Sequence, residues 1–186
     1  MTDVSAGHWA YEYISGLVNR NIVNGYTQPD GSLRFEPANE ITRAELMKLI
    51  VVALNLDLVD DYDGSVFSDW GQVEDWAKPY VAALLEAGIV MGSREGSKVN
   101  INANSNVTRE EMITMTVRAL DVELSESIVE APDFELVSDW ASCYVAFALE
   151  NSMINLDSNY NVNPITNAKR DETAMILYKL LTYMGA

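Results

Sequence analysis

The stretch Ile41-Thr42-Arg43-Ala44-Glu45 opens the segment that decides the fold, and it runs directly into Leu46-Met47-Lys48-Leu49-Ile50-Val51-Val52-Ala53-Leu54. Thr42 and Glu45 have the spacing of a capping box, in which two side chains bond to the free backbone amides of a helix start. The run that follows is apolar on nearly every side of a helix, which is typical of a helix that is buried on most sides. The segment therefore predicts a core helix whose first turn carries Arg43.

The same pattern occurs three times along the chain. Val107-Thr108-Arg109-Glu110-Glu111 repeats it closely, and Ala168-Lys169-Arg170-Asp171-Glu172 repeats it with a lysine in place of the threonine. Thr108 and Glu111 predict a second capping box, whereas the third threonine cap is expected to be missing or to come from Thr166 or Asn167. A cation in the first turn of a helix is unfavourable. Three arginines placed there, which are Arg43, Arg109 and Arg170, therefore suggest that they hold something anionic.

Tryptophan-alanine pairs mark the other half of each copy, at Trp9, Trp76 and Trp140. An apolar pair follows 13 residues after each tryptophan, and the arginine follows after 34, 33 and 30 residues. Self-similarity at a fixed period is the sequence signature of repeat proteins. We therefore predict three repeats, at residues 1–58, 59–123 and 124–186.

Each repeat has the pattern of a helix, a long loop and a second helix. Apolar residues follow each tryptophan at the spacing of an amphipathic helix, so we interpret the tryptophans as anchors of the core, and Gly88 as the end of one such helix. A repeat of about 60 residues buries too little surface to be stable alone. The prediction is an all-α, mainly helical fold in which three helix–loop–helix repeats have a pseudo-threefold arrangement around a central three-helix bundle. The acidic linkers 57–65 and 121–132 are short, so one compact body is expected.

The loops are polar and rich in turn residues, and loops of this length are often functional. One apolar side chain in each is expected to pin the loop to the core: Phe35, Ile101 and Val162. Gly25 and Gly92 occupy matching positions in the first two loops, and Leu156 replaces the glycine in the third.

The composition excludes several classes of function. Among 186 residues there are 28 acidic and 12 basic ones, giving a net charge of −16, which argues against nucleic acid and against adsorption to anionic membranes. No apolar run approaches the length of a membrane span, and the first residues lack the features of a signal peptide. The single histidine, His8, and single cysteine, Cys143, exclude histidine-pair catalysis and an internal disulfide. Residues 157–161 resemble the start of a calcium loop but lack its glycine and glutamate, so we predict a turn there, and no metal or cofactor is expected.

In this order the motifs resemble the S-layer homology domain of bacterial cell-surface proteins. The first copy carries the resemblance almost complete, in Trp9-Ala10, Ile22-Val23-Asn24-Gly25, Phe35-Glu36-Pro37 and Ile41-Thr42-Arg43-Ala44-Glu45. The resemblance implies non-catalytic anchoring by a three-pronged body whose grooves between domains bind secondary cell-wall polysaccharide, often carrying a pyruvate ketal. It assigns the carboxylate-binding role to Arg43, Arg109 and Arg170 and the loop-glycine role to Gly25 and Gly92. Because Leu156 and Lys169 depart from the motif, we expect the groove of Arg170 to be the weakest.

The chemistry of these residues fits that function. A guanidinium can pair with a planar carboxylate through two hydrogen bonds, which a lysine cannot do. Free amides at a helix start would add donors for an anion, and a glycine lets the backbone approach a sugar ring. The simpler alternative is that each arginine only pairs with a nearby acid such as Glu40 or Glu110.

The predicted partner is thus an anionic cell-wall polysaccharide, bound outside the cell in the wall or S-layer by a monomeric fragment of a larger surface protein. Neither nucleic acid nor membrane insertion is expected. Two other functions stay open: a protein–protein assembly module of a surface layer and, with less support, a polysaccharide-processing enzyme that uses a pair of the 28 acids.

Overall fold

The computed structural model describes residues 1–125 and 129–186, so the predicted linker 121–132 lies partly outside the described residues. Within them the chain is mainly helical, and the predicted all-α class is confirmed. The helices are α1 (Tyr11–Asn19), α2 (Arg43–Leu54), α3 (Lys78–Glu86), α4 (Arg109–Arg118), α5 (Ser142–Glu150) and α6 (Arg170–Tyr183). Short 3₁₀ turns form η1 (Gly64–Val66), η2 (Trp70–Gln72) and η3 (Phe134–Leu136). No helix in the described residues has the length and apolar character needed to cross a bilayer.

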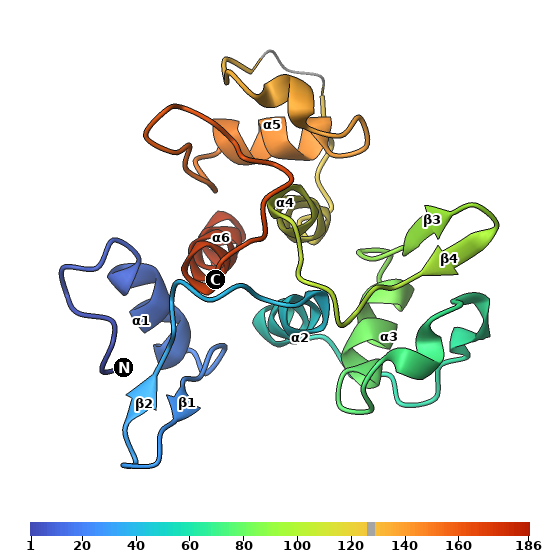
Figure 1. The fold of residues 1–186 in the computed structure, drawn as a ribbon, viewed down its shortest axis with the longest axis horizontal. Helices are drawn as coiled ribbons and strands as arrows, with labels where there is room; N and C mark the ends of the chain where they lie inside the picture. Colours follow the sequence, from blue (N-terminus) through green and yellow to red (C-terminus); the bar gives the residue numbers. More distant parts are fainter. Residues whose placement is uncertain (126–128) are drawn as a thin grey trace. The chain divides into compact units, whose positions relative to one another are not determined.

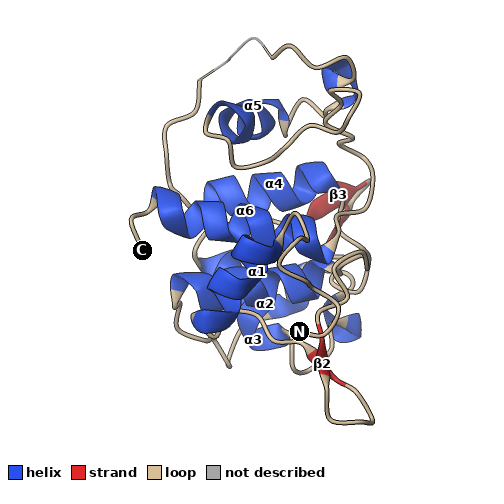
Figure 2. Cartoon of the chain, turned by 90° about the vertical axis from the view of Figure 1, so that its left-hand side faces the viewer, coloured by secondary structure: helices blue, strands red, loops and turns tan. Residues whose placement is uncertain are grey.

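The chain divides into two compact units that do not follow the predicted repeats. One unit consists of Met1–Glu40 and Thr108–Ala186, and the other of Ile41–Val107. In the first unit α1 packs on α6 and α4 packs on both α5 and α6, and in the second unit α2 packs on α3 (Figure 1). Figure 2 shows α4 and α6 side by side within the first unit. Each second helix therefore packs on the first helix of the next repeat, with α6 returning to α1.

The contact between α4 and α6 agrees with the predicted bundle of second helices. The position of α2 relative to these two helices stays a prediction, and so do the pseudo-threefold arrangement and the single compact body. The boundaries of the three repeats likewise remain a prediction from the sequence.

The first helix of each repeat begins two residues after its tryptophan. The alanine between them is the N-cap and is fully buried, at Ala10, Ala77 and Ala141. Each helix ends where one residue adopts the left-handed backbone conformation, at Asn21, Gly88 and Ser152. The amide of the following residue then bonds back into the last turn, which is a common C-terminal cap. The predicted end at Gly88 is thereby confirmed.

The second helices begin at the motif arginines. At Thr42 and Thr108 the hydroxyl accepts the amide of the glutamate three residues on, and that glutamate accepts the threonine amide, so both predicted capping boxes are confirmed. The fully buried Leu46, Met47 and Ile50 confirm α2 as a core helix.

The third helix start lacks a side-chain cap at Lys169, which confirms the expectation that the threonine cap is missing. Glu172 accepts the Lys169 amide at 2.9 Å, which preserves half of the capping box. An ammonium cannot accept a hydrogen bond, and the Glu172 amide instead donates to the Asp171 carboxylate at 2.9 Å. Thr166 and Asn167 make other contacts, so the prediction that they supply the cap is wrong.

Two of the loops are hairpins, which the sequence reading missed. β1 (Tyr26–Thr27) pairs with β2 (Leu33–Arg34), and β3 (Ser93–Glu95) pairs with β4 (Lys98–Asn100), both antiparallel. The third loop turns instead around Asp157, which accepts hydrogen bonds from the Asn159 and Asn161 amides and from the Asn163 side chain. These bonds, led by that from the Asn163 side chain, lower the pKa of Asp157 to about 2. The calcium-like segment is a turn, as predicted.

Candidate functional site

Every motif arginine is tied to the loop of the following repeat rather than to its own. Its Nε donates to the backbone carbonyl of the apolar residue that pins the loop: Arg43 to Ile101 at 3.0 Å, Arg109 to Val162 at 2.8 Å and Arg170 to Phe35 at 2.8 Å. All three pinning residues are buried, as predicted. Each guanidinium is therefore fixed by a neutral acceptor that leaves its terminal NH₂ groups for other partners.

The same loops occupy the first amides of each second helix. The arginine amides donate to the carbonyls of Ser105, Thr166 and Asn39, and the next amides donate to Ala103, Pro164 and Pro37. The expectation that these amides are free to bind an anion is wrong, because the loop backbone already satisfies them. Anion binding at these helix starts would have to come from the guanidinium groups.

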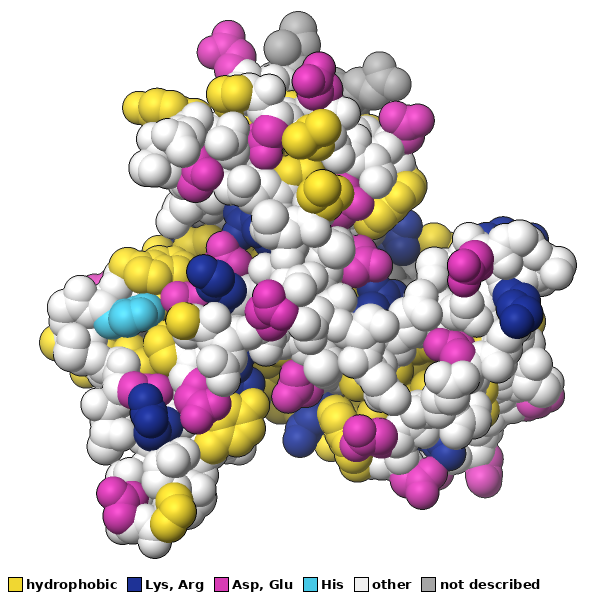
Figure 3. Space-filling view, viewed as in Figure 1, with side chains coloured by type: hydrophobic (Ala, Val, Ile, Leu, Met, Phe, Trp, Pro, Cys, Tyr) yellow, Lys and Arg dark blue, Asp and Glu magenta, His cyan; other side chains and the backbone are white. Residues whose placement is uncertain are grey.

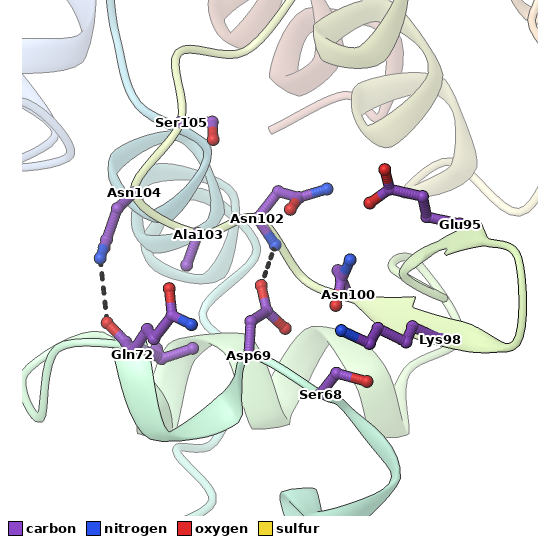
Figure 4. A pocket seen from close by; sticks show the side chains of 11 residues that line it. Ser68, Asp69, Gln72, Glu95, Lys98, Asn100, Asn102, Ala103, Asn104 and Ser105 are labelled. Carbon is purple, nitrogen blue, oxygen red and sulfur yellow. Dashed lines mark hydrogen bonds between the residues drawn. The ribbon is translucent and has the colours of Figure 1, made fainter.

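An aspartate braces each loop from the other side, and the sequence reading missed all three. Asp69 accepts the amide of Ile101 at 2.8 Å and that of Asn102 at 2.7 Å, and Figure 4 shows the bond from Asn102. Asp3 and Asp133 make the same pair of bonds in the other loops. Burial raises the pKa of Asp3, but the two amide hydrogen bonds outweigh it and hold the pKa below its ordinary value. Their spacing in the sequence could have indicated this role, because the three aspartates precede the pinning residues by a nearly constant 32, 32 and 29 residues.

The residue after each pinning residue has a left-handed backbone, with φ of 58° at Glu36 and 55° at Asn102 and Asn163. This turn directs the loop carbonyls toward the helix start. Gly25 and Gly92 precede the hairpins, and a Cβ at either would lie within 3.0 Å of the chain's own atoms. Close packing against the rest of the chain is therefore enough to explain why glycine occupies both positions.

The pairing across repeats corrects which loop belongs to which arginine. The loop of Gly92 meets Arg43, the loop of Leu156 meets Arg109, and the loop of Gly25 meets Arg170. The sequence reading placed each glycine beside the arginine of its own repeat, and that assignment is wrong. The ranking of Arg170 as the weakest site no longer follows from Leu156, which lies at the Arg109 site, and it stays a prediction from Lys169 alone.

A pocket of about 540 Å³ lies beside Arg109 in the first unit. It collects side chains from all three predicted repeats, namely Trp9, Glu40, Arg109, Asn155, Leu156, Asp157, Asn163, Thr166, Asn167, Lys169, Glu172 and Met175. The lining combines an indole ring, three carboxamides, charged groups of both signs and two aliphatic surfaces. Asn167 Nδ2 donates to Glu40 at 3.0 Å and so links two of the repeats.

Arg109 already has an acidic partner in this pocket. Its Nη1 pairs with Glu172, and its Nη2 donates to the Asn155 carbonyl at 3.4 Å. The two side chains are 8% and 23% exposed, so the pair is largely shielded from water. The alternative of pairing with an acid therefore holds for Arg109, although the partner is Glu172 and not Glu110. Glu110 instead accepts hydrogen bonds from the amide and hydroxyl of Ser138.

A family model described as the S-layer homology domain matches residues 1–47 and 66–113. The chain belongs to this family. S-layer homology domains attach surface proteins to the bacterial cell wall, so the chain is an anchoring module of the cell surface. The matched residues contain two of the motif arginines, Arg43 and Arg109, while the divergent third copy lies outside them.

Several much longer proteins contain a similar segment. The chain is 34% identical to the amylopullulanase of Thermoanaerobacterium thermosulfurigenes over 183 residues, which is 96% of the chain and 9% of that protein. It is 35% identical to exoglucanase XynX of Acetivibrio thermocellus over 179 residues, 94% of the chain and 16% of that protein. It is 31% identical to the surface-layer 125 kDa protein of Lysinibacillus sphaericus over 119 residues, 64% of the chain and 10% of that protein. The chain thus spans less than a fifth of the length of these relatives.

Arg170 differs from Arg109 in this S-layer homology protein. Its guanidinium lies 4.7 Å from the ring centres of Tyr26 and Phe35, and Nη1 donates to the Tyr26 hydroxyl at 3.0 Å. Within the residues that the structure describes, no carboxylate pairs with Arg170, and the side chain is partly exposed. Aromatic faces attract a guanidinium without neutralising its charge.

The tryptophans are not buried in the core. Trp9, Trp76 and Trp140 are 50%, 43% and 50% exposed, so their interpretation as core anchors is wrong. The alanine that follows each one is the buried residue, because it fits closely at the helix start and the larger indole remains outside. Trp9 lines the Arg109 pocket, and its Nε1 donates to Asp171 at 3.1 Å.

A second pocket of about 300 Å³ lies in the other unit, where Asp69 and the loop that it holds are part of the lining (Figure 4). Its lining is Ser68, Asp69, Gln72, Val73, Glu95, Lys98, Asn100, Asn102, Ala103, Asn104 and Ser105. As far as the described residues go, this lining contains neither an arginine nor an aromatic ring. The pocket beside Arg109 is therefore the stronger candidate for ligand binding.

Proposed function

We propose that the chain holds a larger surface protein on the cell wall by binding secondary cell-wall polysaccharide, with an acidic sugar such as a pyruvate ketal at a motif arginine. The pocket beside Arg109 carries this proposal, because side chains of all three predicted repeats line it. This lining supports the groove between repeats that the family resemblance implies. The third repeat makes the same arginine, loop and aspartate contacts as the other two, which supports three tandem domains.

The lining of the pocket suits a sugar. The exposed face of Trp9 offers a flat apolar surface for the C–H face of a pyranose ring, and its N–H is already bonded to Asp171. Carboxamides such as those of Asn155 and Asn163 both donate and accept hydrogen bonds, as sugar hydroxyls do. A few placed polar groups around an apolar surface are typical of small-molecule sites.

The motif arginines suit a carboxylate. Because Nε is fixed to a loop carbonyl, each guanidinium has a defined direction before a ligand arrives. An oriented guanidinium can hold a planar carboxylate through two charge-assisted hydrogen bonds. Arg43, Arg109 and Arg170 are therefore the proposed ligand-binding arginines, with Gly25 and Gly92 shaping the loops beside them. Arg109 is already paired with Glu172, so a carboxylate suits this guanidinium less well than one that has no acidic partner of its own.

Net charge adds a constraint on how binding occurs. Acidic side chains are spread over the visible face (Figure 3), and the sequence has 28 of them against 12 basic ones. A protein of net charge −16 repels an anionic polymer at long range, and salt screens this repulsion. We therefore expect moderate salt to leave binding unchanged or to strengthen it, in contrast to binding by a basic surface.

Purified wall sacculi test the proposal directly. The chain should cosediment with sacculi that retain their polysaccharide and should remain in solution with sacculi from which it has been extracted. Equal binding to both preparations would contradict polysaccharide anchoring and favour assembly with wall or surface proteins. Release of reducing sugar ends during the incubation would instead indicate an enzyme.

A further inference from the structure

We infer that the pocket beside Arg109 accepts an uncharged sugar ring and disfavours a carboxylate, and that the acidic sugar of the same polymer binds at Arg170. This inference rests on the proposed function, since both sugars are parts of the wall polysaccharide. It makes Glu172 a residue that determines specificity.

The charges of the Arg109 pocket oppose an anionic ligand. Two cations, Arg109 and Lys169, face the three carboxylates of Glu40, Asp157 and Glu172. The guanidinium is already paired with Glu172, and both groups are largely shielded from water. A ligand carboxylate would therefore have to displace Glu172 or lie beside it, and like charges at short distance in a shielded site repel strongly.

The remaining lining favours an uncharged ring. Trp9 presents half of its surface to solvent and is held by its N–H to Asp171, so its face is positioned before a ligand binds. Asn155, Asn163 and Asn167 supply neutral donors and acceptors around it. An N-acetyl amino sugar or a plain hexose satisfies these groups without introducing charge.

The two oxygens of the Glu172 carboxylate have different partners, so the residue both caps the helix and pairs with Arg109. Its Oε2 accepts the Lys169 amide at the helix start, and its Oε1 faces Arg109. Glu45 holds the same capping position on α2, where its Oε2 accepts the amide and hydroxyl of Thr42. A glutamine at either position retains an acceptor for the cap and removes the charge.

Arg170 offers the opposite environment. Aromatic rings lie on its guanidinium at 4.7 Å, and in the described part of the chain it has no carboxylate partner. Tyr26 and Phe35 belong to the loop of the first repeat, which carries the nearly complete motif. Leu156, where the third repeat departs from the glycine of the motif, does not lie in the loop that Arg170 contacts. That loop belongs to the first repeat and keeps the motif glycine, Gly25.

The test uses the wall polysaccharide extracted from sacculi that bind the protein, both native and after mild acid has removed its ketals. Calorimetry on wild type should show that acid treatment weakens binding on the order of tenfold, which is typical of losing charge-assisted hydrogen bonds. R170K should show a clearly smaller preference for the native polymer than wild type, because lysine keeps the charge but lacks the two-pronged geometry. W9A should weaken both polymers by a similar factor.

Variants at the capping position provide the matched comparison. E172Q frees Arg109 and should increase the preference for the native polymer several-fold, while E45Q should leave that preference unchanged. The inference is overturned if acid treatment has no effect on wild type, if R170K retains the full wild-type preference for the native polymer, or if E172Q leaves the preference unaltered. The proposed function itself fails only if no sacculi bind through their polysaccharide, which the cosedimentation experiment decides separately. R170K makes the test independent of whether E172Q folds well.

Discussion

The indole N–H of Trp9 donates to the buried carboxylate of Asp171 at 3.1 Å, and this bond joins the start of the first repeat to the second helix of the third. The matching positions on the other second helices are Ala44 and Glu110, and Glu110 bonds to Ser138. Among the three motif tryptophans, and within the described residues, Trp9 is therefore the one whose indole N–H bonds to its neighbouring second helix.

Burial raises the pKa of Asp171 above its ordinary value, and the charge of Glu172 acts in the same direction. The folded state then binds the proton more tightly than the unfolded state, so this group favours folding at low pH and the benefit is lost as pH rises through the folded pKa. Replacing Asp171 by Asn should remove that dependence. The stability of D171N relative to wild type should be higher at pH 7 than at pH values near or below the ordinary carboxyl pKa. Urea titrations at several pH values check this, and a pH-independent difference would contradict it.

Removing one of the aspartate carboxylates that hold the loops should lower the stability of the fold. Asp69 accepts two backbone amides, and an asparagine offers one oxygen in place of two. D69N should therefore leave one part-buried amide poorly satisfied, at a cost of about 1–3 kcal/mol in the free energy of unfolding. D60N is the control, because Asp60 is exposed and its replacement removes the same charge. Similar stability of the two variants would show that the brace contributes little.

The sequence predicted those parts of the molecule that depend on neighbouring residues. Capping boxes involve residues three apart, so Thr42 and Thr108 marked both helix starts correctly. The partners of the arginines could not be found in this way, since Arg109 and Val162 are 53 residues apart and Arg170 and Phe35 are 135 apart. Only the packing of one repeat's helix on the next repeat's loop decides those pairs.

Burial of the tryptophans was mispredicted for a different reason. Helical periodicity counts Trp9 as apolar and assigns it to the core, whereas the close contact at the helix start admits only the small Ala10. Large amphipathic rings are rarely fully buried, and an indole that lines a pocket satisfies the same pattern. Trp9 lines the pocket beside Arg109, so under the proposed function its exposed ring is available to a ligand.

The end of α5 offers a stabilising substitution. Ser152 has a φ of 53°, in the left-handed region where a side chain is strained, and Gly88 holds the matching position after α3. S152G should stabilise the fold by about 0.5–1 kcal/mol, because glycine removes the strain of the left-handed conformation. The reverse variant G88S should destabilise it by a similar amount. Thermal unfolding of both proteins tests the pair, and a loss of stability in S152G would refute the argument.

A buried hydroxyl on α4 is the site of a second substitution that should stabilise the fold. Thr114 is 2% exposed, and within the described residues its Oγ1 has no hydrogen-bond partner. Valine has nearly the same shape and no polar atom, so T114V should raise the free energy of unfolding by about 1 kcal/mol. Thr116 is the control on the same helix, since its hydroxyl donates to the Met112 carbonyl at 2.8 Å. T116V should not stabilise the protein, and equal gains from both variants would mean that the unpaired hydroxyl is not the cause.

The different partners of Arg109 and Arg170 predict different stabilities for their alanine variants. R109A leaves the Glu172 carboxylate in a shielded site without its cation and should cost about 2–4 kcal/mol. R170A loses its hydrogen bond to the Phe35 carbonyl, an exposed one to the Tyr26 hydroxyl and its contacts with two rings, and should cost about 1 kcal/mol. Adding E172Q to R109A should restore a substantial part of the loss, because the stranded charge is then gone. Adding E172Q to R170A should restore nothing, and equal rescue in the two backgrounds would show that Arg109 and Glu172 are not coupled in solution.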